Sequence, residues 1–114
     1  MKRVLIGIVS AFALVAFAGP ASAQDTAKGA KVYADQKCSM CHSIAGKGAA
    51  KGPLDGVGSK LTAAEIKEWI VNPVEMTAKA KATRKPAMTA KYKNLPAADL
   101  DALVAYLASL KKTT

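Results

Sequence analysis

Large side chains are scarce in this chain of 114 residues. Aromatic residues make up 5% of it, and both phenylalanines fall in an apolar run near the N-terminus, which leaves three tyrosines and one tryptophan elsewhere. A domain with so few large side chains buries little apolar area of its own, and small domains of this kind often depend on a disulfide, a metal or another covalent group. The composition therefore predicts that such a group is present.

Metal ligands and strand formers are also few. The chain has two cysteines and one histidine, one ligand short of the four that a structural zinc site usually takes. Alternating β-branched runs are missing, whereas alanine, lysine and leucine are abundant, so we expect helices and no strands. The same absence removes the βαβ pattern that a thioredoxin-like redox protein requires.

The N-terminus has the layout of a secretory signal peptide. Two basic residues precede an uncharged apolar run at 4–18, and small residues follow up to Ala23. The run is 15 residues long, shorter than the roughly 20 that span a bilayer. We expect cleavage after Ala23, so that 1–23 are removed as a signal peptide and 24–114 form one domain. The alternative is an uncleaved membrane anchor.

Positive charge dominates the remaining residues. Of 17 basic residues, the two in the signal peptide are lost, which leaves 15 against 8 acidic ones and a net charge of +7. Such a field attracts acidic partners or anionic membrane surfaces. We expect no nucleic-acid partner, because the lysines are scattered along the chain and an exported protein rarely meets nucleic acid.

Helical patterns occupy both ends of the predicted domain. The segment 25–38 has helical spacing, and Gly29 inside it costs about 1 kcal/mol relative to alanine, so we expect another element to approach closely there. The segment 96–112 starts at Pro96, a residue that suits the beginning of a helix, so we expect a helix there. Its apolar stripe is Leu100, Leu103, Val104, Leu107 and Leu110.

The middle of the chain alternates loop and helix. The glycine-rich segment 43–60 predicts a loop. The segment 61–73 opens with a capping box of Thr62 and Glu65 and ends before Pro73, so we expect a helix between them. A further short helix is expected at 75–81.

The sequence CSMCH at 38–42 holds both cysteines and the histidine. A thioredoxin-like pair and a zinc site both lack the context they require, whereas C-x-x-C-H is the attachment signature of haem c. Two thiols one helical turn apart can add to the two vinyl groups of the porphyrin, and the histidine behind them can coordinate iron. We therefore predict one haem c per chain, bound covalently by Cys38 and Cys41 and ligated by His42. A Cys38–Cys41 disulfide is the alternative for protein made without an attachment system.

From this motif onward the chain resembles the class I (mitochondrial-like) monohaem cytochromes c. The matching pieces occur in the family's order: GAKVYADQKCSMCHSI, GPLDGVGSKL, IKEWIVNP and LDALVAYLASLKK. The resemblance implies an all-α cytochrome c fold, with three to five helices wrapped around one covalent haem. It also implies that Gly29 and Tyr33 of the first helix pack against Leu103 and Tyr106 of the last.

Two further residues enter as haem contacts through this resemblance. The backbone carbonyl of Pro53 is expected to accept a hydrogen bond from the second ring nitrogen of His42. Trp69 is expected either to bind a haem propionate or to serve as core packing. Leu54 departs from the asparagine that is usual after the proline, which puts the geometry of that loop in doubt.

No second histidine exists, so the candidates for the sixth iron ligand are the methionines Met40, Met76 and Met88. Met40 lies inside the attachment motif, too close to reach the opposite face of the haem. The family's ligand lies in a polar loop shortly after a proline, which favours Met88 over Met76. A thioether favours ferrous iron and raises the reduction potential, and two protein ligands leave no open site for a substrate.

These features together predict a periplasmic electron carrier that is not an enzyme. We expect a monomer with no stable membrane insertion after cleavage, docking transiently with acidic redox partners such as an oxidase, reductase or dehydrogenase. The alternative is a gas-binding or gas-sensing module, if Met88 leaves the sixth position open. A subunit of a larger enzyme is a third reading. The lysines expected around the haem edge are Lys37, Lys47, Lys51, Lys85 and Lys91.

Overall fold

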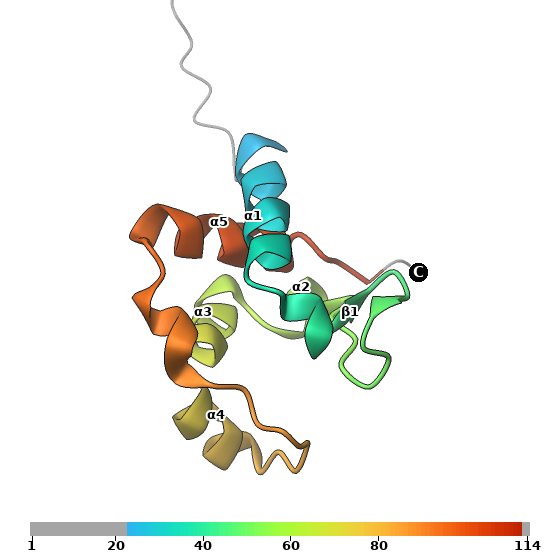
Figure 1. Ribbon diagram of the computed structural model, residues 1–114, viewed down its shortest axis with the longest axis vertical. Coiled ribbons are helices and arrows are strands. Elements are labelled where there is room, and N and C mark those ends of the chain that lie inside the picture. The colour runs from blue at the N-terminus through green and yellow to red at the C-terminus, as the bar shows by residue number, and fades with distance from the viewer. Residues whose placement is uncertain (1–22, 113–114) are drawn as a thin grey trace, which may run out of the picture.

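The structure, a computed structural model, describes residues 23–112, in which the first and last helices cross (Figure 1). Helix α1 spans Ala23–Asp35 and helix α5 spans Ala97–Ala108. Apart from Ala23, which begins α1, the predicted signal peptide at 1–23 lies outside the described residues.

Glycine is required where these two helices cross. A Cβ at Gly29 would lie closer than 3.0 Å to the carbonyl oxygen of Ala102 and to Cβ of Tyr106. The predicted close approach is therefore confirmed, and α5 is the element that makes it. One turn along α1, the ring of Tyr33 meets that of Tyr106 edge to face, with centroids 6.1 Å apart.

Helix α3 (Ala63–Val71) begins and ends where its sequence signals indicate. Thr62 Oγ1 accepts a hydrogen bond from Glu65 N at 3.2 Å, and Glu65 Oε1 accepts one from Thr62 N at 3.1 Å. Pro73 then occupies the first position of α4 (Pro73–Ala80), where its missing N–H costs nothing. The short helix expected at 75–81 therefore starts two residues earlier.

The segment 43–60 is more regular than the loop we expected. Strands β1 (Ser43–Ile44) and β2 (Lys47–Gly48) pair antiparallel, and helix α2 (Val57–Lys60) follows. The expectation of no strands was wrong here, because two-residue strands are too short to show an alternating pattern. Between the strands, Ala45 and Gly46 take positive φ angles of 53° and 78°, as a tight hairpin turn requires.

Both long terminal helices are shorter than their sequence patterns indicated. Helix α1 ends at Asp35 because Lys37 is left-handed, with φ of 57°, and the chain continues as the 3₁₀ turn η1 (Cys38–Met40). Helix α5 stops at Ala108, and the Leu110 carbonyl accepts the Gly58 amide of α2 at 2.9 Å. The C-terminal segment therefore packs on α2 instead of extending the helix.

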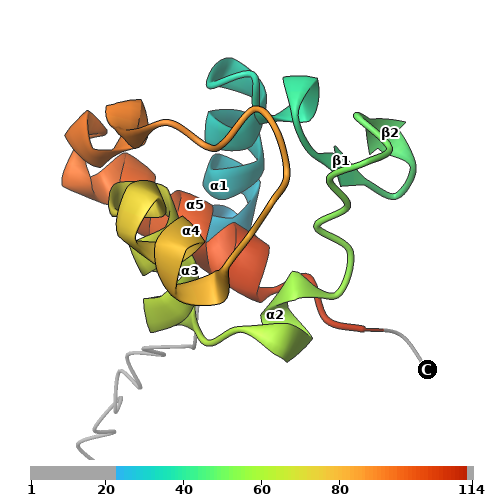
Figure 2. The same ribbon diagram turned by 90° about the horizontal axis from the view of Figure 1, so that it is seen from below.

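The core lies where α1, α3 and α5 meet. Figure 2 shows the hairpin and α2 on one side of α1, with α3 and α4 on the other. The turn η2 (Ala90–Asn94) leads into α5. The buried apolar residues are Val32, Tyr33, Ile66, Ile70, Leu100, Ala102, Leu103, Val104 and Leu107. The expected all-α architecture is thus confirmed, apart from the small hairpin.

Candidate functional site

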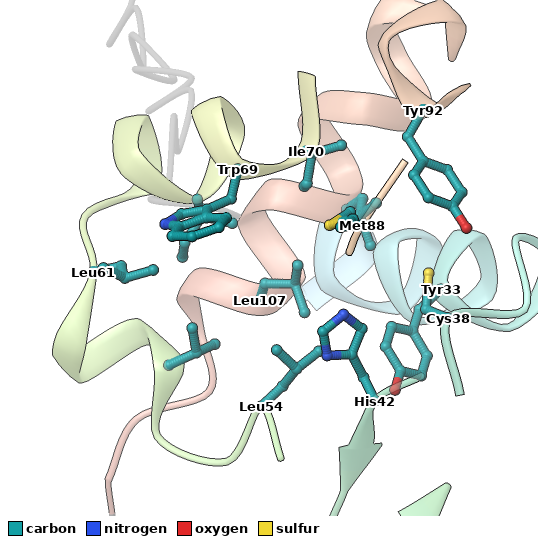
Figure 3. Close-up of a pocket in the computed structure, with 13 residues that line it drawn as sticks. Tyr33, Cys38, His42, Leu54, Leu61, Trp69, Ile70, Met88, Tyr92 and Leu107 are labelled. Atoms are coloured by element: carbon teal, nitrogen blue, oxygen red, sulfur yellow. The ribbon is translucent and has the colours of Figure 1, made fainter. Parts of the chain in front are cut away.

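An apolar cavity of about 710 Å³, including its open mouth, lies against the core and is lined in part by core residues (Figure 3). Its walls come from all parts of the described chain: Tyr33, Cys38, His42, Leu54, Val57, Leu61, Ile66, Trp69, Ile70, Met88, Tyr92, Leu103 and Leu107. A large flat apolar group with few polar contacts fits this lining.

The CSMCH motif forms one tight turn at the edge of the cavity. The amides of Cys41 and His42 both donate to the carbonyl of Cys38, at 3.1 and 2.9 Å. Cys38 is half-buried and lines the cavity, whereas Cys41 is exposed on the same turn. Both are free thiols, so the predicted disulfide alternative is not what the structure holds.

The imidazole of His42 points into the cavity (Figure 3). Its Nδ1–H donates to the carbonyl oxygen of Gly52 at 3.1 Å. Since a carbonyl can only accept, this bond places the proton on Nδ1 and leaves Nε2 with a free electron pair, as an iron ligand needs.

The expected acceptor for this bond, the carbonyl of Pro53, was wrong by one residue. Ser43 pairs with Pro53 in a parallel bridge: its amide donates to Gly52 O at 3.0 Å, and its carbonyl accepts from Leu54 N at 2.8 Å. Successive carbonyls of an extended segment point in opposite directions, so the Gly52 carbonyl faces His42. The Gly52–Pro53 pair in the sequence indicated that this loop lies against His42. It did not indicate which of the two carbonyls faces the imidazole, because that depends on the register between Ser43 and Pro53.

Burial sets the proton affinity of the two cavity-lining groups in the motif. It lowers the pKa of His42, and the nearby charge of Arg84 lowers it further, against the opposing effect of the Gly52 hydrogen bond. Burial raises the pKa of Cys38, so this thiol is protonated at neutral pH. His42 is thus held in the neutral form that binds metal, and Cys38 is a slow nucleophile until an attachment system acts on it.

The methionines are sorted by their position relative to the cavity. Of those in the described part of the chain, Met88 lines it, coming from the loop before η2 and lying across from His42 in the view of Figure 3. Met76 is half-buried on α4 and is absent from the lining. Met40 is 74% exposed. This placement agrees with the preference for Met88 as an iron ligand.

Trp69 and Leu54 both lie in the cavity wall, and in Figure 3 both are on the same side of His42. Trp69 is half-buried, a position from which either of its two expected roles is open, so the propionate contact stays a prediction. Leu54 supplies apolar surface to the cavity where the resemblance leads one to expect a polar residue. No pattern in the sequence indicated that Leu54, Val57 and Leu61 would line the site, because their spacing belongs to no single regular element.

The competing chemistries find no support in this geometry. Across residues 23–112, His, Cys, Asp and Glu side chains form no group of three that could hold a metal ion. The helical frame around the motif also differs from the βαβ unit of a thioredoxin-like protein. In contrast, two thiols on one turn, an imidazole with a free nitrogen and an apolar cavity fit a covalent haem.

The comparisons with known proteins agree with this fit. A family model for cytochrome c matches residues 26–111. No curated protein and no solved structure matched the chain. Within the part described, none of the helices is both long and apolar enough to cross a membrane. The chain therefore belongs to the cytochrome c family, and its cofactor is covalently bound haem c.

Proposed function

We propose that this protein is a periplasmic class I monohaem cytochrome c that carries single electrons on a haem whose iron is ligated by His42 and Met88. Haem-based electron transfer in general follows from membership of the family. The same membership agrees with a carrier that is not an enzyme. Haem c supplies the one-electron couple, and the residues of the chain decide whether the iron is open to other chemistry.

The observation that carries this proposal is that His42 and Met88 line one cavity from different sides. His42 enters from the attachment turn with Nε2 free, and Met88 enters from a loop 46 positions later in the chain. An imidazole and a thioether together complete the coordination of haem iron. A six-coordinate iron changes oxidation state with little rearrangement and offers no site to a substrate.

Carbon monoxide binding to the reduced protein tests this function against gas sensing. We expect wild type to bind it slowly and weakly, because Met88 holds the sixth position. Met88→Ala should bind it readily, and Met76→Ala, which changes a methionine outside the cavity, should behave as wild type. Rapid binding to wild type would favour the sensing alternative instead.

The partner is proposed to be an acidic redox protein that docks near the haem edge. All five lysines named for this role are exposed, which is consistent with a positive docking surface: Lys37, Lys47, Lys51, Lys85 and Lys91. Steered association weakens steeply as salt screens the charges. We expect electron exchange with the physiological partner to slow about tenfold between low and physiological ionic strength. An electron-exchange rate that does not change with ionic strength would contradict the docking proposal and leave the proposed carrier function intact.

A further inference from the structure

The loop that carries Met88 is held in place by almost no backbone hydrogen bonds. The amide of Ala82 donates to Thr77 O at 3.0 Å, at the end of α4, and regular structure resumes at Ala90 in η2. Between them, within the described chain, the backbone of residues 83–89 makes no hydrogen bond to other backbone groups. Its position therefore depends on side chains.

Arg84 supplies the polar side-chain contact in this loop. Its Nη2 donates to the carbonyl oxygen of Cys41, 43 positions earlier in the sequence. Cys41 is one of the two haem-attachment residues and immediately precedes His42. A single charged side chain thus connects the loop of the expected sixth ligand to the turn of the fifth.

The backbone on the attachment side is shaped to receive this guanidinium. A Cβ on Gly52 would collide with both the Arg84 guanidinium and the Cys41 carbonyl. Gly52 is also the residue whose carbonyl accepts the His42 hydrogen bond. Arg84 therefore rests against the backbone that orients His42, which is also why its charge acts on that ring.

We propose that Arg84 is a positioning residue that ties the Met88 loop to the haem-attachment turn and so holds Met88 within reach of the iron. The inference rests on the proposed His42/Met88 ligation. Without the tether, the loop can open while the chain stays folded, because the buried core does not include residues 83–89. Opening would expose the sixth position to any competing ligand.

Imidazole binding to the oxidised, haem-loaded protein tests the inference, since imidazole competes with Met88 for iron. We expect Arg84→Ala to bind imidazole about tenfold more tightly than wild type, the scale of one charge-assisted hydrogen bond. Arg84→Lys should fall between them, because it keeps the charge and loses the planar fork. Lys79→Ala, which removes an exposed charge from α4, should match wild type.

The outcomes separate this inference from the proposed function. The far-red absorbance band of methionine on ferric haem is recorded first, and if wild type lacks it the ligation itself is wrong. If wild type has the band and Arg84→Ala binds imidazole no more tightly, Arg84 has no positioning role. An equal gain in Lys79→Ala would assign the effect to net charge and overturn the inference in the same way. Should Arg84→Ala fail to fold, Arg84→Lys decides on the same criterion.

Discussion

The two sides of the haem cavity are built by different means. On the His42 side, backbone hydrogen bonds run from the attachment turn through the hairpin, for example Ala49 N to Ser39 O at 3.1 Å and Ala49 N to His42 O at 3.0 Å. On the Met88 side, within the described chain, residues 83–89 have no backbone bonds and are tethered through Arg84. The proposed histidine ligand is thus fixed by backbone hydrogen bonds, whereas the proposed methionine ligand lies on a loop that can open.

This difference has a functional meaning for an electron carrier. A histidine fixed by backbone hydrogen bonds would keep the same orientation toward the iron in both oxidation states. A methionine on a loop with few backbone hydrogen bonds can leave the iron at a smaller free-energy cost than global unfolding. The stability of the Met88 loop would therefore decide how often another ligand reaches the sixth position of the iron. The following predictions test how far the two sides differ.

Removal of the covalent attachment should have the largest effect. In Cys38→Ala/Cys41→Ala the apolar walls of the cavity would have no haem to pack against, and the small core contributed by the chain itself would have to stabilise the fold alone. We expect this variant to lose most of its helical circular dichroism. Ser39→Ala, within the same motif, is the matched control and should stay folded. Native helix in the double variant without haem would show that the frame does not depend on the cofactor.

Gly29→Ala should damage the frame on the His42 side, because α1 leads directly into the attachment turn. The added methyl would meet the Ala102 carbonyl and Tyr106, and such overpacking costs about 3 kcal/mol in the free energy of unfolding. Denaturant unfolding measures it. The opposite change on an exposed position of the same helix, Ala27→Gly, should cost about 1 kcal/mol through propensity alone. A neutral or stabilising Gly29→Ala would mean that the helices cross elsewhere.

Amide hydrogen exchange compares the two sides directly. In haem-loaded protein, the amides of Ser43 and Leu54, which donate at 3.0 and 2.8 Å, should exchange about a hundredfold more slowly than those of residues 83–89. Equal protection on both sides would contradict the view that the Met88 loop opens on its own. The same experiment on Arg84→Ala should change the rates in the loop and leave Ser43 unchanged.

The smallest effect concerns the hydroxyl of Tyr33, which is buried and has no hydrogen-bond partner among the described residues. Tyr33→Phe removes an unsatisfied group and should stabilise the protein by about 1 kcal/mol. Burial raises the pKa of Tyr33 above its ordinary value of 10.0, so tyrosinate forms more readily in the unfolded chain. The stability that this contributes is complete below pH 10 and is lost as pH rises above it.

The pH dependence is checked by unfolding wild type and Tyr33→Phe at several alkaline pH values. We expect the variant to lose stability less steeply above pH 10 than wild type. Tyr106→Phe, which alters the ring partner of Tyr33, is the control. A Tyr33→Phe variant less stable than wild type would show that the hydroxyl has a partner in the haem-loaded protein.

Two strong signals in the sequence were read correctly, whereas contacts that depend on the register between loops were not. The capping box of α3 and the role of Gly29 depend on neighbours in the chain or on a residue type with one strong use, and both are confirmed. The Gly52 carbonyl that receives His42 depends on the register between two loops, so Pro53 was chosen instead. Nothing in the sequence marks Arg84, because its partner lies 43 positions away.

The measurement that tests the account most directly is the absorbance spectrum of the haem-loaded protein, oxidised and reduced, for wild type and Met88→Ala. The account predicts the weak far-red band of methionine on ferric haem in wild type, and its loss in Met88→Ala. Met76→Ala should keep it. A wild-type spectrum without this band, with the features of five-coordinate iron, would contradict His42/Met88 ligation and favour an open haem site.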